Sequence, residues 1–299
     1  MPAVQGQVQP PRRALSLGLA AAGGLGLVAA AALAVMLATG GGKAKQPSSS
    51  GGLPNTPDYH SLLVSPTNPK QLTLGTHYGL YRSKDGGRNW KAAGLASSDA
   101  MNLVRTKQAT LWLAGHNVLK KSSDGGSTWS DVQPAGLPSL DVHGFGVHPQ
   151  RPNLLYAAIA GQGLYRSTDG GQSFASVSTA VGPAVMGIAV TPSGTVFAAD
   201  MQHGLVASAN GGTTWTRMLG SQIMGIAVQP RDPRRILAAG AGIFLSTNGG
   251  RSWRRVENLS SGAGPVAWAP SDPRIAYVVG FDQHLYRSDD SGKTWTVVA

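Results

Sequence analysis

Histidine, methionine and aspartate side chains recur along this sequence at intervals of about forty residues, and these residue types could bind a metal ion or a polar ligand. One such series comprises His60, Met101, His143, Met186 and Met224. Imidazole together with thioether suits copper, and a nearby carboxylate can orient an imidazole. The other interpretation is structural: methionine and histidine would fill wedge-shaped space between strands, with the imidazoles hydrogen-bonded to backbone. Both interpretations stay open at this point.

Aspartates and further histidines accompany this series. An aspartate stands two positions before each of its first three members, and a second series contains His77, His116, Gln202 and Asp282. The candidate ligand-binding residues are therefore Asp58, Asp99, Asp141, Gln202 and Asp282. The candidate metal ligands are His60, His77, Met101, His116, His143, Met186, His203, Met224 and His284.

The elements that must position these residues are marked by a phrase that occurs six times, Ser-x-Asp/Asn-Gly-Gly-x-x-Trp with small variations. Its copies are Ser83–Trp90, Ser122–Trp129, Ser167–Phe174, Ser208–Trp215, Ser246–Trp253 and Ser288–Trp295. Their acidic or amide residues are Asp85, Asp124, Asp169, Asn210, Asn248 and Asp290, at intervals of 39, 45, 41, 38 and 42 residues. One tight turn per repeat of about forty residues predicts four-stranded propeller blades.

The phrase itself has a structural explanation. A short Asp or Asn side chain can accept N–H groups from the residues that follow it, and the glycine pair supplies positive φ without a steric penalty. At Asn210 and Asn248 the carboxylate is replaced by an amide, which keeps the acceptor oxygen and loses the charge. A catalytic carboxylate would not tolerate that exchange, so we interpret the six residues as structural.

The phrase resembles the Asp-box, or BNR repeat, of the sialidase superfamily, which also occurs in photosystem II assembly-factor propellers. Stretches such as THYGL and DVHGF resemble bacterial membrane-associated propellers named glycosyl-hydrolase-like. The resemblance covers residues 58–299 and implies an all-β, six-bladed propeller with antiparallel blades. It does not imply one function, because the superfamily holds both hydrolases and non-catalytic binders. We expect the two His/Met/Asp series at one end of the ring, opposite the boxes.

The chain before the repeats differs in composition. Residues 1–13 are polar and end in Arg12–Arg13, and residues 14–39 carry no charge. A run of this length can cross the hydrocarbon core, so we expect a cytoplasmic tail at 1–13 and a transmembrane helix at 14–39. Residues 40–57 are rich in Gly, Ser and Pro and are expected to form a flexible linker. The propeller would then be tethered on the extracytoplasmic side of the membrane; secretion after cleavage of a signal peptide is the alternative.

Composition excludes several classes of site. Cysteine is absent, so there is no disulfide, thiolate nucleophile or cysteine-based metal site. The formal net charge is +11, with four of the 25 basic residues before residue 50. The remaining basic residues are scattered and form no stripe with interleaved aromatics, so we predict no nucleic-acid partner.

The sialidase activity does not carry over to these residues. A sialidase needs an arginine cluster, a Tyr/Glu nucleophile pair and an acid/base Asp, but Glu257 is the one glutamate and lies beyond a box aromatic. Arg82, Arg166 and Arg287 immediately precede boxes, where we expect them on the blade exterior. We therefore predict a non-catalytic propeller that binds a ligand, copper among the candidates, or a protein or glycan partner. The alternative is a glycoside hydrolase that uses two of the candidate aspartates.

Overall fold

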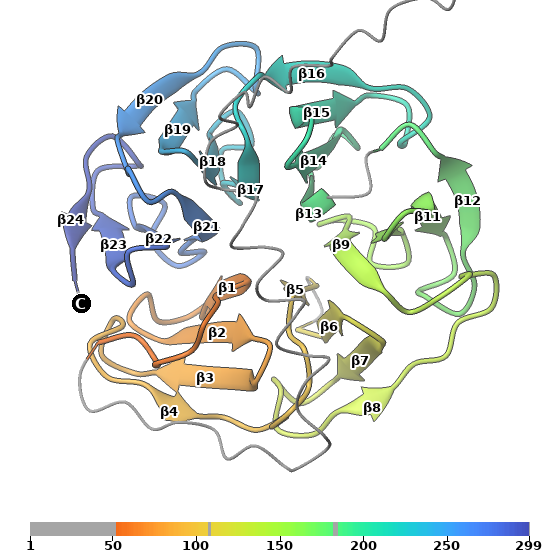
Figure 1. The fold of residues 1–299 in the computed structure, drawn as a ribbon, viewed down its shortest axis with the longest axis horizontal. Helices are drawn as coiled ribbons and strands as arrows, with labels where there is room; N and C mark the ends of the chain where they lie inside the picture. The colour runs from red at the N-terminus through yellow and green to blue at the C-terminus, as the bar shows by residue number, and fades with distance from the viewer. Residues whose placement is uncertain (1–51, 107–108, 182–184, 299) are drawn as a thin grey trace, which may run out of the picture. The chain divides into compact units, whose positions relative to one another are not determined.

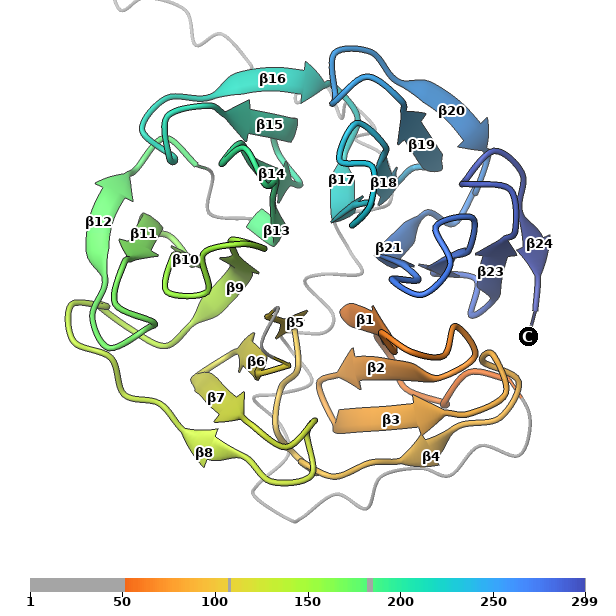
Figure 2. The ribbon, with the colours of Figure 1, turned by 180° about the vertical axis from the view of Figure 1, so that it is seen from behind.

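The structure, a computed structural model, describes residues 52–106, 109–181 and 185–298. Over these residues the chain forms twenty-four strands in six sheets, and each sheet takes four consecutive strands in chain order. The sheets surround a central axis as the blades of a propeller, seen from opposite sides in Figures 1 and 2. The predicted all-β, six-bladed architecture is confirmed. We number the blades 1 to 6 along the chain.

The strands take equivalent places in every blade. The innermost strands are β1 (Ser61–Val64), β5 (Asn102–Arg105), β9 (Val142–Val147), β13 (Val185–Val190), β17 (Ile223–Val228) and β21 (Ala263–Trp268). The second strands are β2 (Leu72–Thr76), β6 (Leu111–Gly115), β10 (Leu155–Ile159), β14 (Val196–Asp200), β18 (Ile236–Gly240) and β22 (Ala276–Gly280). The third strands are β3 (Gly79–Ser83), β7 (Val118–Ser122), β11 (Gly163–Ser167), β15 (Gly204–Ser208), β19 (Ile243–Ser246) and β23 (Leu285–Ser288). The outer strands are β4 (Lys91–Ala92), β8 (Ser130–Asp131), β12 (Ala175–Ser178), β16 (Thr216–Leu219), β20 (Arg254–Glu257) and β24 (Thr296–Val297).

Burial follows the position of a strand in its blade. In β6, β10, β14, β18 and β22 every residue is buried. These strands are covered on both faces by neighbouring blades, which explains their continuous apolar sequences. The outer strands are exposed along at least half their length. The core is therefore distributed between adjacent blades.

Each repeated phrase forms the turn between the third and outer strands. In blade 3, Ser167 Oγ donates a hydrogen bond to Oδ1 of Asp169 (2.8 Å) and accepts the N–H of Gly171 (2.9 Å). Oδ1 of Asp169 also accepts the N–H groups of Gln172 and Ser173, both at 3.0 Å. The serine makes the same two bonds in the other five turns. This role of the buried serine was not predicted from the sequence.

The turns also fasten one blade to the next. Nη2 of Arg82, on β3, donates to the carbonyl oxygens of Gly125 (3.0 Å) and Gly126 (3.1 Å) in the turn of blade 2. The guanidinium of Arg82 thus makes a partly exposed contact that joins two blades, which the sequence did not predict. Arg82 is therefore a structural contact between blades 1 and 2.

The ring closes by packing between blade 6 and blade 1, since β1–β4 and β21–β24 form separate sheets. Leu72 and Leu74 of blade 1 share one buried cluster with Val279 and Leu285 of blade 6. The hydroxyl of Tyr277 donates to the carbonyl oxygen of Pro69 at 3.0 Å, across the same boundary. Neither of these two blades takes a strand from the other.

The expectations for residues 1–13, 14–39 and 40–51 lie outside the described residues. Among the residues that the structure describes, no helix is long and apolar enough to span a membrane. The described end of the expected linker packs on blade 1: Leu53 is buried in the cluster that closes the ring, and Tyr59 donates its hydroxyl to the carbonyl oxygen of Pro54 (2.7 Å). Residues 52–57 form no strand.

Candidate functional site

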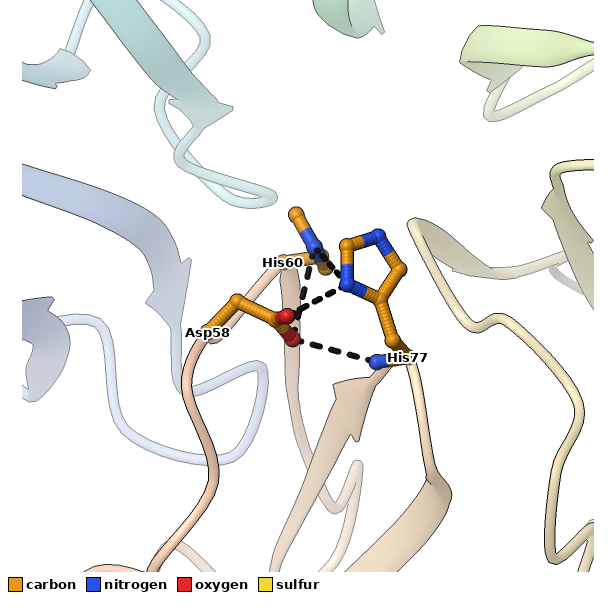
Figure 3. A group of neighbouring side chains, drawn as sticks. All are labelled: Asp58, His60 and His77. Carbon is orange, nitrogen blue, oxygen red and sulfur yellow. Dashed lines mark hydrogen bonds and ion pairs between the residues drawn. The ribbon is translucent and has the colours of Figure 1, made fainter. Parts of the chain in front are cut away.

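Aspartates that precede the inner strands hold the turns between the second and third strands. In blade 1, Oδ1 of Asp58 accepts the N–H of His77 (3.1 Å), and Oδ2 contacts Nδ1 of the same imidazole. In blade 2, Oδ2 of Asp99 accepts the N–H of His116 (2.9 Å) and contacts its Nδ1. Figure 3 shows the arrangement in blade 1. The sequence placed these aspartates and histidines in two separate series, and the fold joins them as pairs.

The free side of each imidazole faces the aspartate of the following blade. Nε2 of His77 lies 3.7 Å from Oδ1 of Asp99, and Nε2 of His116 lies 3.8 Å from Oδ1 of Asp141. His60 stands at one end, its Nε2 3.5 Å from Nδ1 of His77. At the other end is His143, described below. We call these seven side chains the Asp–His row: Asp58, His60, His77, Asp99, His116, Asp141 and His143.

Blade 3 departs from the pattern of blades 1 and 2. Gly161 stands in the turn where those blades have a histidine, so Asp141 holds no turn imidazole. Instead, Oδ1 of Asp141 lies 3.2 Å from Nε2 of His143. This distance is short enough for a hydrogen bond, but the angle between the two groups does not suit one. Both atoms are buried and have no hydrogen-bond partner among the described residues. Oδ1 of Asp141, at the end of the row, is therefore without a hydrogen-bond partner among the described residues.

The pKa values within the row diverge because burial and charge pairing oppose each other. Burial lowers the pKa of His60 to about 4, and it also lowers the pKa of His143. The hydrogen bond with Asp99 raises the pKa of His116. Burial is the largest effect on the pKa of His77 and would lower it, but the hydrogen bond with Asp58 and the negative charges of Asp99 and Asp58 together raise it by more.

Two of the aspartates in the row behave alike. Burial is the largest effect and would raise the pKa of Asp58 and of Asp99, but the hydrogen bonds from His77 and His116 and the charges of nearby imidazoles together lower both pKa values below the usual range. These carboxylates therefore stay ionised at neutral pH, and the row carries negative charge beside imidazoles that can become protonated.

The other predicted polar residues stay in turns of blades 4 and 6. Asp200 accepts the N–H groups of Gln202 (2.7 Å) and His203 (3.0 Å), and its Oδ2 lies 3.1 Å from Nδ1 of His203. Asp282 accepts the hydroxyl of Tyr286 at 2.5 Å, and His284 lies 3.5 Å from its Oδ2. Among the described residues, groups of three or more clustered imidazoles and carboxylates occur in the Asp–His row alone.

The inner strands enclose a central cavity of about 570 Å³. Its lining is mainly apolar and includes Met101, Met186 and Met224 together with His60. The structure thus separates most of the predicted metal ligands: the three methionines line the cavity, His77, His116 and His143 belong to the Asp–His row, and His60 belongs to both.

Arg105 also lines the cavity and was missed at the sequence level. Its Nε is buried without a hydrogen-bond partner among the described residues, and burial lowers the pKa of its guanidinium. The sequence did contain a signal. Aligned on His60 and its counterparts, Arg105 takes the place that valine has in four blades, at Val64, Val147, Val190 and Val228.

Asn102 was missed as well. Its Nδ2 donates to the carbonyl oxygen of His143 (2.9 Å), and its Oδ1 accepts the N–H of Phe145 (3.1 Å). A buried side chain of β5 therefore fixes the backbone of β9, which carries His143. An asparagine inside an otherwise apolar inner strand was the available signal.

The six four-stranded blades and the repeated Ser-x-Asp/Asn-Gly-Gly turns define the chain as a propeller of the BNR-repeat class. The family model described as photosynthesis system II assembly factor YCF48 matches residues 61–298, and the chain belongs to that family. The predicted resemblance to BNR-repeat and photosystem II assembly-factor propellers is thus confirmed. No curated protein matches the sequence.

Solved structures share the fold at low sequence identity. YCF48 bound to D1 peptide is 17% identical, with a TM-score of 0.52, over 85% of this chain and 84% of that one. The GH74 xyloglucanase from Xanthomonas campestris is 19% identical, with a TM-score of 0.58, over 86% of this chain and 46% of that one. The GH74 enzyme from Niastella koreensis is 18% identical, with a TM-score of 0.52, over 80% of this chain and 46% of that one. This chain spans about half the length of the two GH74 enzymes.

Proposed function

We propose that this protein is a non-catalytic binder of a protein segment, which it receives at the central cavity of the propeller. The observation that carries the proposal is the pairing of an apolar cavity of about 570 Å³ with the unpartnered guanidinium Nε of Arg105. Membership in the YCF48 family and the peptide in the YCF48 structure support the same class of function.

The lining suits a peptide with apolar side chains and a carboxylate. Met186 and Met224 are half-buried on the cavity wall, and methionine adapts its shape to irregular apolar partners. A guanidinium whose buried Nε has no hydrogen-bond partner among the described residues favours a carboxylate, which an arginine can bind through two parallel hydrogen bonds. The preferred segment would therefore carry an acidic residue or a free C-terminus next to apolar residues.

A peptide library tests this function. Immobilised peptides with a free C-terminal carboxylate are compared with the same peptides amidated, and with peptides in which Asp and Glu are replaced by Asn and Gln. We expect the full-length chain to select apolar peptides that carry a carboxylate, and Arg105→Gln to weaken that selection by about tenfold or more. Arg251→Gln, at an exposed arginine in the turn of blade 5, is the control. Uniform binding to neutral and acidic peptides would contradict the proposal.

The glycoside hydrolase alternative is less well supported. Such an enzyme needs one carboxyl group with a raised pKa as general acid beside a second carboxylate. The pKa is lowered at Asp58, Asp99, Asp200 and Asp282. Hydrolysis of a β-glucan or xyloglucan that is lost in Asp99→Asn and Asp141→Asn would nevertheless establish this alternative.

Copper belongs to the proposal as a candidate ligand of the cavity, because three methionines and His60 line the same space. Thioether sulfur favours Cu(I). Met186→Leu keeps the apolar volume and removes the sulfur, so it should weaken Cu(I) binding if the cavity takes the ion. Metal analysis of protein from copper-replete medium tests this point directly.

We further propose that residues 14–39 anchor the protein in a membrane, with residues 1–13 in the cytoplasm, a linker at 40–51, and the propeller outside. The uncharged run and the Arg12–Arg13 pair before it support this arrangement. Protease digestion of intact cells should then remove the propeller. An N-terminus at or after residue 40 in the mature protein would show secretion instead.

A further inference from the structure

We propose that His116, Asp141 and His143 bind one divalent transition-metal ion, Zn²⁺ in the first place, at the end of the Asp–His row. The three donors are Nε2 of His116, Oδ1 of Asp141 and Nε2 of His143, drawn from blades 2 and 3. This site goes beyond the proposed peptide binding and does not depend on it.

The donor atoms are free to take a ligand. Oδ1 of Asp141 and Nε2 of His143 are buried without a hydrogen-bond partner among the described residues. Two such atoms side by side cost free energy unless a third group satisfies both. The two atoms are near enough for an ion pair when His143 is protonated, and a metal ion would take the place of that proton. A cation accepts lone pairs from both atoms at once.

The separations fit a small metal ion. Oδ1 of Asp141 lies 3.2 Å from Nε2 of His143 and 3.8 Å from Nε2 of His116. Each of the three residues offers one possible ligand atom that lies within 4.8 Å of those of the other two. Tetrahedral Zn²⁺ with bonds of about 2.0–2.2 Å places its ligands roughly 3.3 Å apart. Small side-chain rotations would bring the donors to these distances.

A supporting contact already orients one ligand. Nδ1 of His116 is bound to Oδ2 of Asp99, so Nε2 is the nitrogen left for the metal. A carboxylate that holds the far nitrogen of a metal-binding imidazole fixes its orientation and raises its basicity. Asp99 is therefore a positioning residue in this site, and it is buried.

The other two groups of three residues in the row are less suited to binding a metal ion. In the group of Asp58, His60 and His77, the Asp58 oxygens are occupied by the backbone N–H and Nδ1 of His77. In the group of His77, Asp99 and His116, Nδ1 of His116 is already bound to Asp99. Nε2 of His77 and Oδ1 of Asp99 are also without a hydrogen-bond partner among the described residues, but they lie 3.7 Å apart, whereas Oδ1 of Asp141 and Nε2 of His143 lie 3.2 Å apart.

The chemistry of the donors selects the metal. Two imidazoles and one carboxylate form a nitrogen and oxygen set, which suits Zn²⁺ and related divalent ions, whereas Cu(I) prefers thiolate or thioether. Three protein ligands leave a fourth position, and the side chains of His116 and Asp141 are 30% and 37% exposed. Water or a carboxylate of a binding partner can reach that position.

Calorimetric titration of the metal-stripped, tagless full-length chain with Zn²⁺ at neutral pH tests the site. We expect one ion per chain with a Kd near or below about 1 µM. His143→Ala and Asp141→Asn should each weaken binding about a hundredfold or more, and Asp99→Asn about ten- to a hundredfold. Asp141→Asn keeps the size of the side chain, so it serves if His143→Ala does not fold.

His203→Ala and Met186→Leu are the matched controls. His203 also sits at a turn beside an aspartate but lies in blade 4, outside the row, and both controls should bind Zn²⁺ as the parent protein does. Absence of stoichiometric binding would overturn the proposal. So would binding that survives both His143→Ala and Asp141→Asn, or that is lost in either control.

Discussion

A Cβ atom on Gly87 would lie 2.0 Å from Cδ2 of Leu285, although the two residues are nearly two hundred positions apart in the chain. The first blade's turn is therefore pressed against the last blade, and this contact helps to close the ring without strand exchange. Gly87 also has a φ of 98°, which L residues with a Cβ rarely adopt. Leu285 is fully buried, so it has little room to move.

Gly87→Ala should consequently destabilise the propeller more than Gly86→Ala. Both glycines have positive φ, which costs alanine about 1–2 kcal/mol. At Gly86 the nearest atom to a new Cβ is Tyr277 Oη at 3.6 Å, an ordinary contact. At Gly87 overpacking adds about 1–3 kcal/mol. Urea unfolding of the two variants measures the difference, and Leu285→Ala in the Gly87→Ala background should recover part of it. Equal losses at both glycines would contradict the packing explanation.

The buried serine of the repeated turn gives a second prediction. Ser167 is 1% exposed and pairs with both the Gly171 N–H and the Asp169 carboxylate. Ser167→Ala leaves a buried N–H without an acceptor, so the free energy of unfolding should fall by about 1–3 kcal/mol. Thermal unfolding followed by circular dichroism measures it. Gln172→Ala, at an exposed residue of the same turn, should have little effect.

The acidic member of the turn should matter as an acceptor rather than as a charge. Asn210 in blade 4 accepts the N–H of Thr214 (2.9 Å), as Asp169 accepts that of Ser173. Asp169→Asn should therefore lower the melting temperature less than Asp169→Ala. Equal losses in the two variants would show that the turn requires the negative charge.

Two turn carboxylates predict how stability depends on pH. The hydrogen bond from the Asn89 side chain lowers the pKa of Asp85 to about 2. Backbone N–H groups act in the same direction, and slight burial acts against them. The pKa of Asp290 is also about 2. An unfolded Asp titrates near about 4, so both groups stabilise the fold above that pH, and the contribution is lost as pH falls toward about 2.

The melting temperature should accordingly drop between about pH 4 and pH 2. Asp85→Asn should make the drop shallower, and Asn248→Asp should make it steeper by adding a fifth turn carboxylate of the same kind. Melting curves across this pH range provide the measurement. An unchanged slope in both variants would mean that these turns do not govern acid unfolding.

The repeats were sufficient to predict the blades because each turn is local. A Ser, an Asp or Asn and two glycines within five positions form their hydrogen bonds with one another, so the sequence alone reveals them. The fully buried second strands were equally visible as apolar runs. The contact of Arg82 was not predicted because its partner, the turn at Gly125 and Gly126, lies in another repeat.

The site was predicted in composition but not in pairing. Asp58 and His77 belong to different series in the sequence, and only the fold places the residue before an inner strand beside the turn of the same blade. The step from His116 to Asp141 crosses blades, so its distance depends on how the blades pack. Metal ligands that looked equivalent in the series therefore separated into a carboxylate-rich row and a methionine-lined cavity.

The last prediction concerns Asn102, which links blade 2 to the strand that carries His143. Asn102→Ala removes the partner of the Phe145 N–H and of the His143 carbonyl oxygen, both at the blade boundary. Leaving two such groups unpaired should lower the free energy of unfolding by about 2–4 kcal/mol. Asn258→Ala, at an exposed asparagine, should change it by less than about 0.5 kcal/mol.

The same substitution should also affect the proposed metal site. Because Asn102 fixes the backbone at His143, Asn102→Ala should weaken Zn²⁺ binding by about tenfold under conditions where the variant is folded. Calorimetry at a temperature well below its melting transition separates this effect from unfolding. A destabilised variant with unchanged Zn²⁺ affinity would show that Asn102 holds the blades together but does not position His143.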